Sequence, residues 1–474
     1  MSQTFTIARA EWRLHRRRRS YWLLIALFAA ILVTAAGLNR TRQLAERERQ
    51  QSFQQLVRAQ WEGQPERHPH RVAHYGTFAF KPPGPLAAFD PGVESYAGRS
   101  VYLEAHRQNA TNFTPAGELS SAFRLGELSL AFVLQLILPL VAIVLGHRAM
   151  VDEAASGRLR LLLGQGVVAR ALVLGKLSGL GLALAPFIAL GLLVSGATLL
   201  TDPAFTGDAS ALARTAIIGV AVALHTLAWL ALTIWISVRA TSAAKACGTL
   251  VTLWIATMII APRAAALVAE TLHPLPDKTS FAAAMAEDVR KLGDAHDPND
   301  PHFARFRQET LARYGVSKVE DLPVNYGAVV MAHGEELSAQ TFARHFAALA
   351  GRMEAQVDVI ERASLFAVPL AIRTISAAAA GTDLRAQLKF EQEAEAYRFH
   401  FVQELNALHR DKITFANDRD QKLSPEHWKQ FADFRATPLP LADALRGTAF
   451  SWLAVLIWAL VPTLALLRLR PIVR

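Results

Sequence analysis

Three closely spaced histidines are the first residues in this sequence that could do chemistry. His68, His70 and His74 could together hold a borderline metal ion, since two or three imidazoles suffice for such an ion. Their neighbours include the basic residues Arg67 and Arg71, and no cysteine or nearby aspartate joins them. We therefore expect a solvated loop with no bound metal, and a metal site remains the alternative.

A second group of polar residues lies inside long apolar runs. His225 is ionisable, and such a residue is costly in lipid unless it faces a bundle interior or a cavity. Gln135 and Thr226 carry weaker signals of the same kind. We favour a neutral His225 hydrogen-bonded to a neighbouring helix over a role in a transport pathway. An intramembrane enzyme built around His225 would need paired catalytic groups, which the spacing does not supply.

The sequence contains no nucleotide-binding motif. Gly175-Lys176-Leu177 lacks both the upstream glycine of a phosphate loop and the hydroxyl that would bind magnesium. No H-E-x-x-H motif is present, so a zinc protease is not supported. We expect no enzymatic activity and no cofactor in this chain, and any ATP chemistry would belong to another protein.

The charged segment at residues 148–170 separates two apolar runs and could dock a partner. Acidic residues open it, a glycine interrupts it, and a basic, leucine-rich stretch follows. A plain connector needs no leucine run on the water side, whereas a short amphipathic helix in a partner's cleft does. We therefore favour docking over a connector. The predicted docking residues are Asp152, Glu153, Gly157, Arg158, Leu159, Leu161 and Leu162.

These residues must be positioned by membrane-spanning helices. Apolar runs approach or exceed the roughly 18–20 residues that cross a bilayer, and helix is the form that satisfies the backbone in lipid. The predicted fold is an all-α polytopic membrane protein with six transmembrane helices. The spans are residues 20–38, 128–147, 171–200, 211–238, 246–268 and 447–467.

The basic residues predict the orientation of these spans. They gather before the first span (Arg16–Arg19), between the second and third, and after the last, so the positive-inside rule places both termini in the cytoplasm. The short loop Thr201–Ser210 contains two aspartates and no basic residue. The net charge of +10 therefore reflects topology and a lipid bilayer, with no nucleic-acid partner. A cleaved signal at residues 20–38 is the alternative, which the length of the apolar run disfavours.

Two large segments, 39–127 and 269–446, would lie outside the cytoplasm. The first begins with a polar, helix-favouring run and becomes irregular at Lys81–Gly92. The second contains continuous apolar stripes with helical spacing in Leu337–Ile360 and Asp383–Arg410. We expect a mostly helical domain in which these two helices form an antiparallel pair and bury their stripes against each other.

The order of these motifs resembles the ABC-2-type transporter permeases. The matching residues are Glu153, Gly157-Arg158-Leu159, Leu161–Leu163, Arg170 and Leu174-Gly175-Lys176, together with Glu11 in a basic N-terminal segment. The resemblance is closer to a subgroup with an enlarged outer domain, akin to gliding-motility and copper-enzyme-maturation permeases. Residues that carry this closer resemblance are Ser364-Leu365, Pro369, Ala380–Asp383, Phe390 and Tyr397-Arg398.

The resemblance implies that this chain works together with other protein chains. Residues 1–19 would form an interfacial elbow helix, and Glu153 with Gly157–Leu163 would form the coupling helix for a cytoplasmic ABC ATPase dimer that holds ATP and magnesium. Residues 468–474 would be a cytoplasmic tail. A second permease copy or a paralogue would complete an exporter in a bacterial inner membrane. The alternative is a non-transporting receptor or scaffold whose outer helical domain binds a partner.

Overall fold

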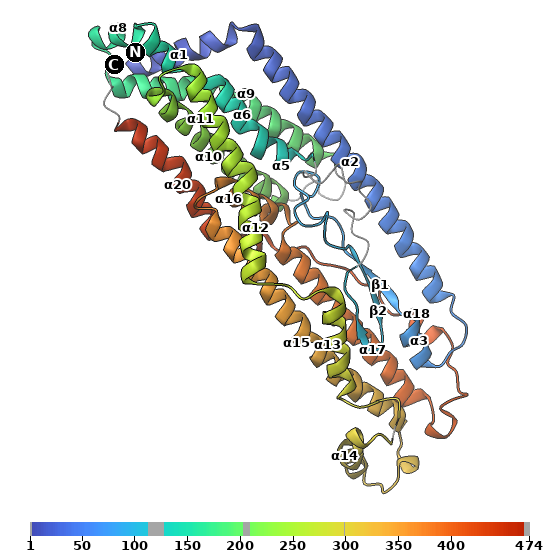
Figure 1. The fold of residues 1–474 in the computed structure, drawn as a ribbon. Helices are drawn as coiled ribbons and strands as arrows, with labels where there is room; N and C mark the ends of the chain where they lie inside the picture. The colour runs from blue at the N-terminus through green and yellow to red at the C-terminus, as the bar shows by residue number, and fades with distance from the viewer. Residues whose placement is uncertain (1, 112–127, 202–208, 298, 469–474) are drawn as a thin grey trace.

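The computed structural model describes residues 2–111, 128–201, 209–297 and 299–468. Within these ranges the chain forms an elongated molecule with a helical bundle at one end and a second, mostly helical domain at the other (Figure 1). Most of the predicted acidic loop and of the predicted C-terminal tail lies outside the described residues.

Six helical segments are long and apolar enough to cross a membrane, which confirms the predicted count. Two of them are composite and include π-helical turns. They are α2 (Arg19–Glu62), α5–η2–α6 (Leu130–Phe132, Val133–Ile137, Leu138–Gly146), α9 (Ala169–Leu200), α10 (Ala209–Arg239), α11–η3–α12 (Ala243–Ile255, Ala256–Ile260, Ala261–Leu272) and α20 (Ala449–Leu467). The helix α10 lies at the centre, where it contacts α6, α9 and α20. The start of α1 (Gln3–Arg16) and the end of α20 lie at the same end of the bundle (Figure 1).

A further buried helix, α16 (Val368–Ala380), packs against α10 and α20 and was not predicted. It has only 13 residues, too few to span a bilayer. Arg214 of α10 donates a hydrogen bond to the carbonyl of Ala379 at 2.9 Å. This contact fixes the end of α16 against the bundle.

The membrane-distal domain contains the predicted antiparallel pair, α15 (Tyr326–Ala363) and α17 (Leu384–Lys412). The amide of Asn325 donates to the carbonyl of Arg410 at 3.1 Å, so the start of α15 lies beside the end of α17. The predicted burial of one stripe against the other is wrong. The two helices do contact each other, and Arg398 of α17 lies over the ring of Phe342 in the α15 stripe, but other stripe residues pack elsewhere. Phe346 of α15 packs on α13 (Lys278–Arg290) and Ile360 near α12, whereas the stripe of α17 packs on Trp61, Trp428 and a small sheet.

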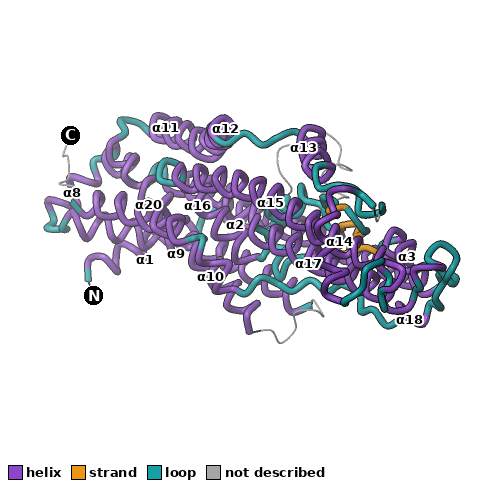
Figure 2. Tube along the Cα trace, turned by 90° about the horizontal axis from the view of Figure 1, so that it is seen from below, coloured by secondary structure: helices purple, strands orange, loops and turns teal. Residues whose placement is uncertain are grey.

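That sheet is antiparallel and has the order β1 (Thr77–Phe80), β2 (Ser100–Glu104), β3 (Arg107–Gln108). The segment between β1 and β2 is irregular, as predicted, and it lies against the corner between α16 and α17. A Cβ on Gly92 would lie 2.4 Å from the carbonyl oxygen of Thr382, so this close approach requires glycine. Shorter elements complete the domain: α3 (Pro69–Tyr75), η4 (Pro301–Phe303), α14 (Ala304–Tyr314), η5 (Val319–Asp321), η6 (Phe415–Asn417), α18 (Glu426–Lys429) and α19 (Leu441–Arg446). Seen from below, α13 lies at the edge of the molecule, in line with α11 and α12 (Figure 2).

Candidate functional site

The N-terminal helix α1 packs closely along α9. Two glycines of α9 permit this approach, because a Cβ on Gly179 would lie 2.7 Å from the carbonyl oxygen of Ala8, and one on Gly175 would lie 3.0 Å from that of Thr4. The predicted N-terminal helix therefore forms, and it is held against the third span.

Lys176 of α9 joins α1 to the charged loop. Its Nζ lies 2.7 Å from Glu11 Oε2 and 2.7 Å from Glu153 Oε1, and Lys176 is only 5 % exposed. His15 approaches the other oxygen of Glu11 at 3.5 Å. Burial alone would raise the pKa of the Glu11 carboxyl, but the hydrogen bond with His15 and the charge of Lys176 outweigh burial and lower it. Lys176, Glu11 and Glu153 thus form one charged cluster that joins α9, α1 and the charged loop.

The predicted docking loop contains two short helices, α7 (Val151–Ala155) and α8 (Arg158–Gly164). Gly157 separates them with a left-handed backbone (φ 72°), a conformation that glycine adopts without strain. Arg158 Nε lies 2.8 Å from Glu153 Oε2, and Arg148 Nε lies 2.9 Å from Asp152 Oδ2. The acidic residues of the loop are therefore paired with basic groups of the same chain.

The leucines of α8 do not all face outward. Leu159 is buried in the core of the bundle, and Leu162 packs partly against that core. Leu161 is 60 % exposed and stands beside the exposed Arg158 and Arg160. The expectation that the leucines together fill a partner's cleft therefore fails for Leu159, since a seven-residue helix must also anchor itself to its own bundle.

Gln135 and His225 meet inside the bundle. Gln135 lies in the π-helical turn η2, and Pro139 follows four residues later without the N–H that would bond its carbonyl. His225, fully buried on α10, places Nε2 3.0 Å from this carbonyl oxygen. This contact is the hydrogen bond to a neighbouring helix that the favoured interpretation of His225 predicts.

The neighbouring Thr226 does not take part in this contact. Its hydroxyl donates to the carbonyl of Val222 in its own helix at 2.7 Å. The next carbonyl of η2, that of Leu136, accepts a hydrogen bond from Trp254 Nε1 at 3.1 Å. Side chains of α10 and α11 thus satisfy two consecutive carbonyls of η2.

A cavity of about 760 Å³ opens where the bundle meets the membrane-distal domain. Both π-helical turns contribute to its wall, through Gln135 and Met258. Its charged lining residues carry both signs, and apolar side chains lie between them. The charged residues are Asp90, Arg263, Glu354, Asp358, Glu361, Arg373, Asp383 and Arg385. Such a wall suits a ligand with both apolar and charged parts.

The three histidines found in the sequence do not lie in a loop, because Pro69–Tyr75 form the helix α3 with His68 as its N-cap. His68 points to His409 and Asp418, with ring centroids 4.3 Å apart for the two histidines. His70 and His74 share a different face of α3, and their Nε2 atoms are 3.1 Å apart. The three side chains therefore do not converge on one point.

Comparisons with protein families cover both parts of the chain. A model described as ABC-2 family transporter protein matches residues 5–290, more than half of the sequence. A second model, described as a domain of unknown function (DUF3526), matches residues 279–437 in the membrane-distal domain. No curated protein matches this sequence.

Proposed function

Because this chain belongs to the ABC-2 family of transporter proteins, we propose that it is a permease that exports its substrate with energy from a separate cytoplasmic ATPase. The family supports a membrane-spanning permease of an ABC transporter. The ATPase partner, the direction of transport and a setting in a bacterial inner membrane with both termini in the cytoplasm are parts of the proposal.

The observation that carries this proposal is the Lys176 cluster. A force on α7 reaches α9 through the pair of Glu153 with Lys176, and it reaches α1 through the pair of Lys176 with Glu11. At the exposed tip of the loop, the apolar side chain of Leu161 lies beside the basic residues Arg158 and Arg160. An ATPase with an acidic-rimmed cleft would fit this tip.

The cavity where the bundle meets the membrane-distal domain is the proposed substrate-binding site. Its mixed charges and apolar walls suit an amphiphile such as a lipid or a peptide. A second permease, either another copy or a paralogue, would complete the path.

A co-purification experiment tests the proposed ATPase contact. The chain is produced together with an ABC ATPase from the same genome, and retained ATPase is measured for wild type, Leu161→Asp and Leu275→Asp. Leu275 is a matched control, because it is an exposed leucine just beyond the membrane-distal end of α12. We expect Leu161→Asp alone to lose the ATPase, since a charge replaces the apolar side chain.

Equal retention of the ATPase by both variants would overturn the proposed contact. If wild type itself retains no ATPase and hydrolyses no ATP in the co-expressed membranes, the scaffold alternative gains support.

A further inference from the structure

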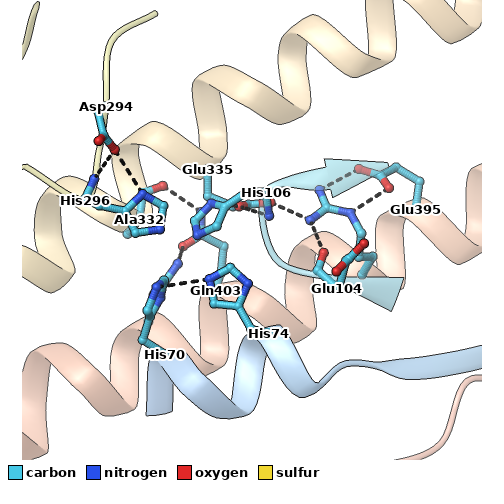
Figure 3. Close-up of polar contacts among 12 residues, drawn as sticks. His70, His74, Glu104, His106, Asp294, His296, Ala332, Glu335, Glu395 and Gln403 are labelled. Carbon is cyan, nitrogen blue, oxygen red and sulfur yellow. Dashed lines mark hydrogen bonds and ion pairs between the residues drawn. The ribbon is translucent and has the colours of Figure 1, made fainter. Parts of the chain in front are cut away.

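Four histidines from three distant segments converge in the membrane-distal domain. His70 and His74 come from α3, His106 from the turn between β2 and β3, and His296 from the segment after α13 (Figure 3). One ring nitrogen of each lies within 4.8 Å of the others. A tetrahedral zinc ion with bonds of about 2.0 Å holds its nitrogens about 3.3 Å apart, so a small inward movement would suffice.

Carboxylates orient two of these four imidazoles. His106 Nδ1 lies 3.0 Å from Glu335 Oε2, and His296 Nδ1 lies 3.0 Å from Asp294 Oδ1. Glu335 is itself fully buried and paired with Arg398, which fixes its position. Metal-binding histidines are held in this way, with one nitrogen on a carboxylate and the other left for the ion.

The four imidazoles cannot supply a hydrogen-bond donor for every acceptor nitrogen in the cluster. A neutral imidazole has one donor and one acceptor. His106 and His296 each use Nδ1 as the donor toward a carboxylate, so their Nε2 atoms are acceptors, and that of His106 is buried without a partner. His70 and His74 can share only one proton between their facing Nε2 atoms. A cation would satisfy the remaining lone pairs.

The backbone at His106 gives independent support. Its φ of 62° is positive, and within the described residues no other residue except glycine has a positive φ. Such a conformation is strained for a residue with a Cβ and tends to persist where a side chain is needed. Glycine would be favoured in this turn by backbone energy alone.

We propose that His70, His74, His106 and His296 bind one borderline transition-metal ion, of the zinc or copper class, and that this ion fastens α3 and the β2–β3 turn to the segment after α13. Four imidazole ligands suit such ions better than calcium or magnesium, which prefer oxygen. The site joins the regions matched by the two family models, since His296 lies in the DUF3526 region and the other three histidines in the ABC-2 region.

Metal titration of the full-length protein in detergent, without a polyhistidine tag, tests this site. Zn²⁺ and Cu²⁺ are added in separate calorimetric titrations to wild type, His106→Gly, His296→Gln and the control His400→Gln. His400 lies in the same domain, with a side chain 74 % exposed. We expect wild type and the control to bind one ion, and X-ray absorption of the loaded protein to report four nitrogen ligands at about 2.0 Å.

His106→Gly separates metal binding from folding. Because glycine accepts the positive φ and the backbone N–H of residue 106 still donates to Glu335, this variant should fold while losing the ion. Asp294→Asn should weaken affinity by about 10–100-fold, since it removes only the orienting carboxylate. Undiminished binding by His106→Gly and His296→Gln overturns the site. The proposed site is also overturned if only His68→Gln loses the ion, because the ion would then lie at His68, His409 and Asp418.

Discussion

Lys176 lies between two carboxylates from different segments, and all three groups are largely withdrawn from water. A buried charge is costly unless it is paired, so each partner here depends on the others. The cluster therefore holds α1, α7 and α9 in one arrangement. Ion pairs on the surface would hold them less firmly, because water screens their charges.

Glu11→Gln should change how stability depends on pH. The pKa of Glu11 is lower in the folded chain than the ordinary 4.5, so its contribution is present above pH 4.5 and is lost as the pH falls through the folded value. We expect Glu11→Gln to cost about 2 kcal/mol at pH 7 through loss of a charged hydrogen bond. Thermal unfolding in detergent between pH 7 and pH 3 should show a smaller acid-induced loss than in wild type.

Glu426→Gln is the matched control for this measurement. Glu426 pairs with Lys429 at 2.9 Å on the surface, where its side chain is 75 % exposed, so its removal should leave stability almost unchanged. Identical pH profiles for Glu11→Gln and wild type would contradict a stabilising role for the cluster.

The transmembrane helices of the second and fifth spans each contain a π-helical turn, and each is followed by a proline. Such turns leave carbonyls without their usual partners, and in lipid those carbonyls must be satisfied by neighbouring helices. His225 and Trp254 do so for the second span. The two polar side chains are thus part of the packing between helices.

His225→Leu and Thr226→Val should therefore differ although the residues are adjacent. His225→Leu leaves the carbonyl of Gln135 without its donor and should lower stability in detergent by about 1 kcal/mol. Thr226→Val removes only a side-chain hydrogen bond to the carbonyl of Val222 in the same helix. That carbonyl also accepts a backbone hydrogen bond of α10, so the substitution should have little effect. Equal losses in chemical unfolding would show that the contact across helices is not the cause.

Several elements could be predicted because their signal is local. Six spans follow from the length of apolar runs, and the helix that continues from the first span follows from its polar, helix-favouring sequence. The helix α16 could not be predicted as part of the bundle, because its 13 residues are too short for a span. The strands of the sheet have five residues or fewer, too few to show a clear alternation.

The candidate sites also contain some residues that the local sequence marks and others that only the folded structure brings together. The loop with Glu153 and Gly157 is marked by its own residues, but the inward position of Leu159 depends on packing that no local pattern records. The histidine cluster was visible only in part, since His106 and His296 lie far from α3 in the chain and meet it only after folding.

On the scale of the whole molecule, the proposed ATPase contact and the proposed substrate cavity lie at opposite ends of the bundle. Val357→Trp should separate the two functions, because a larger side chain would reduce the cavity without touching α7 or α8. We expect retained ATPase in co-purification but reduced stimulation of ATP hydrolysis by an amphiphilic substrate.

Leu161→Asp provides the opposite pattern, with loss of the ATPase itself. Normal substrate stimulation in Val357→Trp would argue against the cavity as the substrate-binding site, whatever the outcome for Leu161.

The helix α2 runs without interruption for 44 residues, from the start of the first span into the membrane-distal domain, where it ends near α3 and α18 (Figure 1). A helix of this length measures about 66 Å, so a tilt of about 5° at its base would displace its tip by about 6 Å. At that tip Arg58 bonds the carbonyl of Phe431 at 2.6 Å, and Trp61 bonds that of Trp428 at 2.9 Å. A small tilt of the first span would therefore move the contacts that α2 makes with α18 and Phe431 in the membrane-distal domain.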